Sequence, residues 1–74
     1  IKYETNLAGK IELSVFNIKG QKLKTLIDSY QAPGVYTLTW DGSDMGGNKV
    51  ASGTYLYSLI TPGKKIIKKM ILVK

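Results

Sequence analysis

The stretch over 35–40 reads Val-Tyr-Thr-Leu-Thr-Trp, and its strict alternation decides the fold class. One face of an extended chain carries the large residues Tyr36, Leu38 and Trp40, and the other face carries a valine and two threonines. A period of two in β-branched and aromatic residues is typical of a half-buried β-strand. The stretch therefore predicts a strand over 35–40 whose aromatic face points into a core.

Downstream, the sequence predicts a second aromatic strand that opens at Gly53. Its large residues again share one face: Tyr55, Tyr57 and Leu59. Between the two aromatic strands, 44–47 has the Asp and Gly placements of a turn. Pro62-Gly63 is the central pair expected of a type II turn, which leads into a final strand over 64–73. The second half of the chain therefore reads as strands separated by turns.

Upstream, the segment 10–17 alternates as well, with Ile11, Leu13 and Val15 on one face. The residues 17–20 have the Asn and Gly placements of a type I turn, which predicts a hairpin that returns over 21–28. In the returning strand Leu23 and Leu26 are three residues apart, which breaks the period of two. A β-bulge between them, or an early strand end, would place both on the inner face.

These segments, together with a strand over 1–5 and a short piece near 49–50, make six or seven strands. Turn chemistry recurs at intervals of about ten residues, which is typical of an all-β domain. We therefore predict one domain over 1–74, a compact immunoglobulin-like β-sandwich of mainly antiparallel strands. A core of this size supplies only a few kcal/mol of net stability, so nearly every apolar residue has to pack.

Two segments have the Gly-x-Tyr pattern of the tyrosine corner of immunoglobulin-like folds. The first is Gly34-Val35-Tyr36, and the second lies within 51–57 and contains Tyr55. In such a corner the hydroxyl bonds to a backbone group upstream while the ring fills the edge of the core. Either tyrosine could be the corner residue.

The chain has no cysteine, histidine or arginine. Disulfides and thiolate metal sites are therefore excluded, and so is a Ser-His pair. A lysine-activated serine is chemically possible, and an acid/base pair of Glu12 and Asp41 is conceivable, but no spacing joins either set. We predict no catalytic activity, no catalytic residues, no cofactor and no metal.

The net charge of +6 comes from 11 lysines against 5 acidic residues. An excess of positive charge is typical of proteins that bind nucleic acid or an anionic membrane surface, and it can also serve solubility alone. Since bidentate phosphate and guanine recognition depends on arginine, nucleic acid is not an expected partner. No apolar run reaches the length of a membrane span.

Two groups of residues invite a functional interpretation besides a structural one. Asp41, Asp44 and Asn48 suggest a calcium loop, but we interpret them as two turns whose carboxylates accept local backbone N–H groups. The aromatic residues suggest a sugar- or base-stacking platform. However, Tyr36, Trp40 and Tyr55 alternate in phase with leucines, which indicates core.

The lysine-rich tail over 64–74 has two interpretations that can hold together. Its lysines would guard a closing edge strand against aggregation. Alternatively, a receptor would read the backbone and the lysines of a terminal strand.

Several motifs follow one another along the whole chain. In order, they are Ile1-x-Tyr3, Val15-Phe16-Asn17-Ile18-x-Gly20-Gln21, Pro33-Gly34-Val35-Tyr36, Trp40-Asp41-Gly42-x-Asp44-x-x-Gly47, Val50-Ala51-Ser52-Gly53-Thr54-Tyr55 and Lys68-Lys69-Met70-x-Leu72. This order resembles the type A C-terminal sorting domain of the type IX secretion system of Bacteroidetes and their relatives. It is also similar to the immunoglobulin-like domain of the flagellar hook-capping protein, which shares the Trp-Asp-Gly and Gly-x-Tyr patterns.

The resemblance implies a non-catalytic secretion signal, joined to a cargo domain upstream. The cargo would be in the periplasm in transit, and then secreted or held at the cell surface. The implied partners are the outer-membrane translocon, a shuttle protein and a sortase-like protease. The absence of an initial Met predicts that the chain is a fragment of a longer secreted protein. The alternative is a passive immunoglobulin-like module of an extracellular enzyme or of a flagellar hook-cap protein.

The resemblance also assigns residues to roles. The expected fold-determining residues are Gly20, Gly34, Tyr36, Trp40, Asp41, Gly42, Gly53 and Tyr55. The expected partner-recognition residues are Lys68, Lys69, Met70, Leu72 and Lys74. Among these, Lys69 and Lys74 would be charged anchors, and the strand backbone would be the template.

Overall fold

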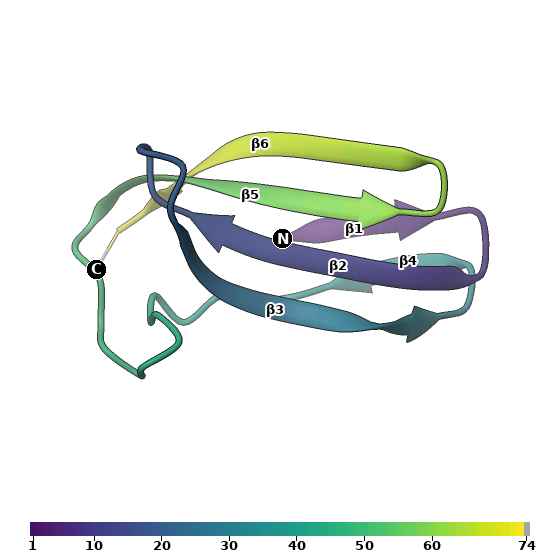
Figure 1. The fold of residues 1–74 in the computed structure, drawn as a ribbon, viewed down its shortest axis with the longest axis horizontal. Helices are drawn as coiled ribbons and strands as arrows, with labels where there is room; N and C mark the ends of the chain where they lie inside the picture. The colour runs from purple at the N-terminus through teal and green to yellow at the C-terminus, as the bar shows by residue number, and fades with distance from the viewer. Residues whose placement is uncertain (74) are drawn as a thin grey trace.

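The structure, a computed structural model, describes residues 1–73 and contains six β-strands and no helix within them (Figure 1). The strands are β1 (Lys2–Thr5), β2 (Gly9–Phe16), β3 (Lys22–Gln31), β4 (Gly34–Thr37), β5 (Gly53–Thr61) and β6 (Lys64–Leu72). Within the described residues no helix could span a membrane. The predicted all-β class is confirmed.

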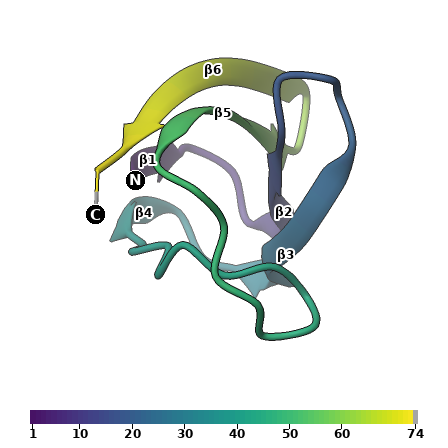
Figure 2. The same ribbon diagram turned by 90° about the vertical axis from the view of Figure 1, so that its left-hand side faces the viewer.

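The strands form two antiparallel sheets that face each other (Figure 2). The larger sheet has the order β3-β2-β5-β6, and the smaller sheet is the pair β1-β4. Each aromatic strand therefore belongs to a different sheet, and the two aromatic faces meet across the interior. This arrangement confirms the predicted immunoglobulin-like sandwich.

The core is centred on β2, which is hydrogen-bonded to a neighbour on both sides. Ile11, Leu13 and Val15 of this strand are fully buried, as the alternation predicted. Leu59 of β5 and Tyr3 of β1 complete the interior, and the Tyr3 ring stacks on Tyr36 with centroids 5.4 Å apart. Each such side chain contributes about 1.5–3 kcal/mol when it leaves water.

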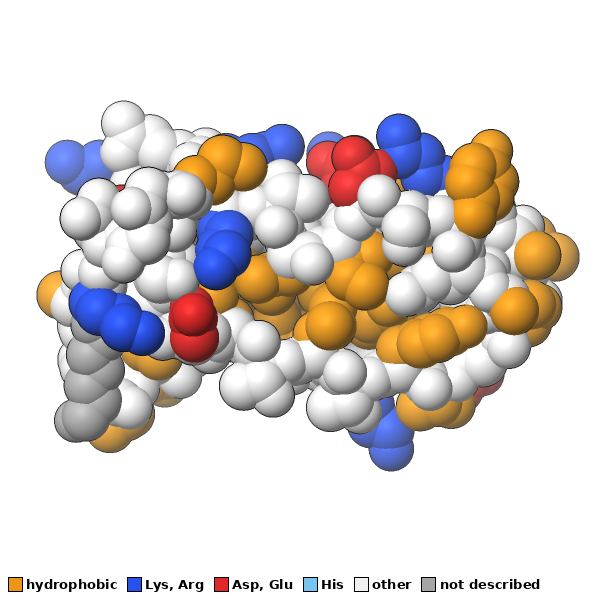
Figure 3. Space-filling view, turned by 90° about the horizontal axis from the view of Figure 1, so that it is seen from below, with side chains coloured by type: hydrophobic (Ala, Val, Ile, Leu, Met, Phe, Trp, Pro, Cys, Tyr) orange, Lys and Arg blue, Asp and Glu red, His pale blue; other side chains and the backbone are white. Residues whose placement is uncertain are grey.

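The smaller sheet covers the larger one incompletely. Seen from below, on the side of β3 and β4, hydrophobic side chains lie open in a furrow along the long axis (Figure 3). Leu26, Ile27, Tyr36 and Leu38 pack against the core but are only partly buried. The sandwich is therefore open where a larger domain would have a further strand.

The predicted irregularity of the returning strand is confirmed. The register between β2 and β3 shifts at two places, between Leu13 and Ser14 and between Val15 and Phe16. The residues skipped on β3 are Leu26 and Leu23, and both are partly buried. With these bulges the strand continues to Gln31, which is beyond the predicted end at Asp28.

Two predicted strands are shorter than expected. The strand predicted over 35–40 ends at Thr37, because its partner β1 begins at Lys2, the residue paired with Thr37. Beyond it the amine of Ile1 donates to the carbonyl of Leu38 at 2.6 Å, and the alternating burial continues to Trp40. The short strand expected near 49–50 is only an isolated bridge between Ser43 and Lys49.

Both candidate tyrosine corners are present. The Tyr55 hydroxyl donates to the carbonyl of Ala51 at 2.5 Å, and the Tyr36 hydroxyl donates to the carbonyl of Ala32 at 2.5 Å. In each case the acceptor lies four residues upstream, at the loop that precedes the strand. The two corners therefore fix the starts of β5 and β4 by the same interaction.

Replacing Gly9 by Ala should destabilise the domain, because a Cβ there would overlap Cγ of Pro62. The proline ring cannot swing away, so overpacking should cost about 1–3 kcal/mol of unfolding free energy, measured by urea denaturation. In a Pro62→Ala background the same substitution should cost less. An equal cost in both backgrounds would contradict the contact.

Removing the corner hydroxyls should have unequal effects. Tyr55 is buried, and its bond to Ala51 is partly shielded from water, whereas the bond from Tyr36 to Ala32 is exposed. Tyr55→Phe should therefore lower the unfolding free energy by about 1 kcal/mol, and Tyr36→Phe by less, because water replaces the lost donor there. Urea denaturation of the two variants tests this order, and the reverse order would refute it.

Candidate functional site

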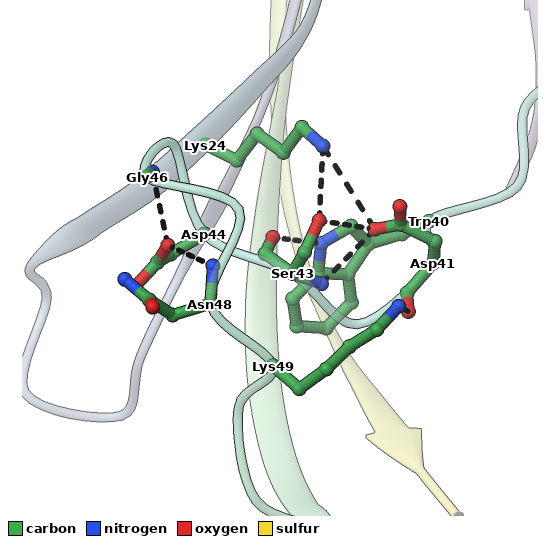
Figure 4. Close-up of polar contacts among 8 residues, drawn as sticks. All are labelled: Lys24, Trp40, Asp41, Ser43, Asp44, Gly46, Asn48 and Lys49. Atoms are coloured by element: carbon green, nitrogen blue, oxygen red, sulfur yellow. Dashed lines mark hydrogen bonds and ion pairs between the residues drawn. The ribbon is translucent and has the colours of Figure 1, made fainter.

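The loop between β4 and β5 carries the densest group of polar contacts (Figure 4). It is anchored by Trp40, whose indole N–H donates to the carbonyl of Ser43 at 2.8 Å. The indole also meets the Tyr55 ring edge-on, with centroids 5.1 Å apart. Trp40 therefore joins the loop to the tyrosine corner of β5.

Asp41 and Ser43 form the polar centre of this loop. One carboxylate oxygen of Asp41 accepts from the Ser43 backbone N–H at 3.0 Å and from its hydroxyl at 2.5 Å. The Lys24 ammonium, from β3, lies 3.1 Å from the Ser43 hydroxyl and 3.8 Å from the Asp41 carboxylate. These hydrogen bonds from Ser43, and then the charges of Lys24 and Lys49, lower the pKa of Asp41 below its ordinary value of 3.8.

Asp44 organises the second turn of the loop, as predicted. Its carboxylate accepts from the backbone N–H groups of Gly46 and Asn48, each at 3.0 Å. Gly42 and Gly47 have φ values of 77° and 80°, which other residues rarely adopt. The interpretation of 41–48 as two turns is confirmed, and residues 1–73 contain no group of acidic residues able to hold a metal.

The structure brings one serine, Ser43, into contact with a lysine, Lys24, as a lysine-activated serine would require. The other contacts of these two side chains do not favour Ser43 as a nucleophile. The Lys24 amine lies 3.8 Å from the Asp41 carboxylate, so it contacts an acidic group as well as the serine. The serine hydroxyl already donates to Asp41, and Ser43 is buried. The carboxylates of Glu12 and Asp41 contact different lysines, Lys22 and Lys24.

The aromatic residues belong mainly to the interior. Tyr3 and Tyr55 are buried, and Tyr36, Trp40 and Tyr57 are partly buried. Tyr30 is 82% exposed and has no aromatic neighbour among the ring pairs of the described residues. A flat stacking platform for sugars would need several exposed rings, and residues 1–73 do not provide one.

The glycines expected to determine the fold lie at turns and strand starts. Gly20 closes the β2–β3 turn with a φ of 86°, and its N–H donates to the carbonyl of Asn17 at 3.0 Å. Gly34 and Gly53 are the first residues of β4 and β5, directly after the acceptor loops of the two corners. These glycines therefore lie at turns and strand starts, and their role in determining the fold stays a prediction.

The predicted recognition residues lie on β6, an edge strand of the larger sheet. Lys68 and Lys69 are exposed, and Met70 and Leu72 turn partly inward. Ile67 and Ile71, on the outer face, are 60% and 75% exposed. Lys74 lies outside the residues that the structure describes, so its role as a charged anchor stays a prediction.

The lysines of the chain differ in whether they form an ion pair. Within the described part of the chain the ion pairs involve Lys10, Lys22 and Lys24, and Lys49 donates to the carbonyl of Asp41. Lys64, Lys65, Lys68 and Lys69 take part in none of them. Sequence reasoning identified this strand, but it missed Lys24 and Ser43, because no spacing links β3 to the loop.

Comparison with known proteins identifies one family. The family model described as the FlgD Ig-like domain matches residues 2–61, which contain β1 to β5 and end at the last residue of β5. The strand β6 lies outside the matched residues. Neither a curated protein nor a solved structure matches the chain.

The loop should loosen in acid because Asp41 loses its charge. Its lowered pKa means that the carboxylate stabilises the folded state above pH 3.8, and that this contribution is lost as the pH falls through the lowered pKa. Asp41→Asn removes the titrating group, so the stability difference between the two proteins should shrink in that range. Urea unfolding, followed by the fluorescence of Trp40, measures it.

The matched control is Asp28→Asn, whose carboxylate makes one exposed ion pair with Lys10. It should change stability at neutral pH less than Asp41→Asn does. A difference between wild type and Asp41→Asn that stays constant below pH 3.8 would contradict the role of the Asp41 charge.

Proposed function

The chain belongs to the FlgD Ig-like domain family, a family of structural modules, and from this premise we propose that it is a non-catalytic C-terminal secretion signal. It directs an attached periplasmic cargo through the type IX secretion system to the cell surface or the medium. Its work is to be bound by the secretion machinery, and the polar groups of its loop serve the fold.

The observation that carries this proposal is the exposed basic edge strand. β6 is paired on one side only, and its four lysines have no ion pair within residues 1–73. Unpaired charge of one sign on a free strand edge guards against self-association and also offers a template for a partner strand. The order of motifs along the whole chain supports the same proposal.

In this function the partners are proteins of the outer membrane. A translocon and a shuttle protein bind the domain while it is in the periplasm, and a sortase-like protease removes it from the cargo. Lys68 and Lys69, with the backbone of β6, form the recognition surface, and the partly buried side chains of Met70 and Leu72 hold the strand to the sandwich. The domain over 1–74 is then one piece of a longer secreted protein.

The second candidate is a passive immunoglobulin-like module of an extracellular enzyme or of a flagellar hook-cap protein. The family match favours it directly, because the matched residues include the whole of the fold except β6. In that function the lysines of β6 only protect the edge. The two candidates therefore differ in whether β6 is needed for transport.

A fusion of the full chain to a periplasmic reporter tests the proposal in a host with a type IX system. The reporter should appear outside the cell. Lys69→Glu should lower the exported fraction on the order of tenfold, the effect of about 1.4 kcal/mol of lost binding. Lys19→Glu, an equal charge change at the exposed β2–β3 turn, is the matched control and should export normally.

Both variants should have the melting temperature of the wild type, since both positions are exposed. A folded fusion that stays in the periplasm would refute the secretion signal and leave the passive module. Equal export by Lys69→Glu and the wild type would refute the recognition role of β6.

A further inference from the structure

One long side of the sandwich is open between β1 and β6, which we call the β1–β6 seam. β1 is hydrogen-bonded only to β4, and β6 only to β5, so no ladder joins them. Figure 2 shows the two strands as neighbours at the same side of the molecule. The free edge of β6 therefore faces a space that the second sheet does not close.

Three hollows follow one another along this seam. The first, of about 280 Å³, lies between Thr5 and Lys64 at the start of β6. The second, of about 250 Å³, lies between Tyr3 and Ile66. The third, of about 210 Å³, lies between Ile1 and Leu72 at the end of the strand. An apolar cavity of about 150 Å³ accepts a molecule the size of benzene, so the middle hollow and the hollow at the end of β6 can each take one large aliphatic side chain. The first hollow is lined mainly by polar residues.

The floor of the seam is apolar. Tyr57, Leu59 and Ile66 line the middle hollow. Trp40, Met70 and Leu72 line the hollow at the end of β6. Because the hollows lie along one strand, the side chains that fill them would come from one extended segment, whose alternate residues point the same way.

The rim of the seam is basic. Lys2 and Lys68 line the middle hollow and Lys64 lines the first, against the single acidic residue Glu4. The lysines of β6 are exposed and take part in no ion pair of the described residues. On the other face of the same strand, Lys65 and Lys69 are exposed as well. An added strand would thus meet ammonium groups on both of its faces.

This charge pattern selects the occupant. A second copy of the chain, added through its own β6, would bring lysines against lysines, which opposes pairing. An extended segment with carboxylates at the positions beside these lysines would neutralise them. Backbone pairing would supply affinity, and the hollows and charges would supply the choice of sequence.

We propose that the β1–β6 seam binds an extended acidic segment of a partner protein, which adds a strand to β6. Its apolar residues, all on one face, fill the two apolar hollows, and the carboxylates on its opposite face meet Lys65 and Lys69 on the outer face of β6. The inference deepens the proposed function and rests on it, because it gives the chemistry of the segment through which the secretion machinery holds the domain.

A synthetic peptide of the length of β6, in which valine alternates with glutamate, tests the proposal on the full purified chain. Calorimetry should show binding by one peptide per domain. Amide hydrogen exchange should show new protection along β6. A peptide of the same composition with the glutamates gathered at one end keeps the charge but loses the alternation, and it should bind at least about tenfold more weakly.

Charge reversal on the chain provides the second arm. Lys69→Glu, on the outer face of β6, should weaken binding of the alternating peptide on the order of tenfold, and Lys19→Glu, with the same charge change at the β2–β3 turn, should leave it unchanged. Binding of the two peptides with equal affinity, or an equal effect of the two substitutions, would reduce the interaction to net charge and overturn the proposal. Protection at β3 in place of β6 would overturn it too, as would a β6-mediated dimer that excludes the peptide.

The failure of this inference is separable from the failure of the proposed function. If the reporter fusion is exported but the alternating peptide does not bind, the secretion signal stands and the strand-addition site is wrong. If the peptide binds β6 but the fusion stays in the periplasm, the site stands and its assignment to the secretion machinery is wrong.

Discussion

The structure depends on the burial of one strand, β2, beneath a sheet of only two strands. Ile11 and Leu13 are fully buried in one cluster with Tyr3 of β1, and the Tyr3 ring stacks on Tyr36 of β4, which packs against the same cluster. Two strands can cover the middle of a four-stranded sheet but not its edges. The edge strands β3 and β6 are therefore half-covered, which explains both the furrow in Figure 3 and the β1–β6 seam.

The small size of the β1–β4 sheet also explains why the loop between β4 and β5 contains so many hydrogen bonds. Between β4 and β5 the chain crosses from the small sheet to the large one without strand pairing beyond the bridge of Ser43 and Lys49. Trp40, Asp41 and Asp44 satisfy backbone groups that a ladder would otherwise satisfy. This cluster of polar side chains resembles a binding site, but its hydrogen bonds within the loop explain it as a structural feature.

The lysines of β6 link stability to function. An edge strand with exposed isoleucines is prone to pairing with another copy, and lysines oppose this by mutual repulsion. The same charges leave the edge available to a partner of opposite charge. One physical feature thus serves both the protection of the edge and the proposed recognition.

Local patterns were enough for the strands, the turns and much of the core. Alternation placed Ile11, Leu13 and Val15 inside, and the three-residue spacing of Leu23 and Leu26 indicated a bulge, because side-chain direction in a strand follows from local geometry. Spacing could not choose between Tyr36 and Tyr55, because each corner bond is local and both can form. The early end of β4, the contact of Lys24 with Ser43, and the β1–β6 seam depend on which strands lie opposite one another, and that follows from packing between residues distant in the chain.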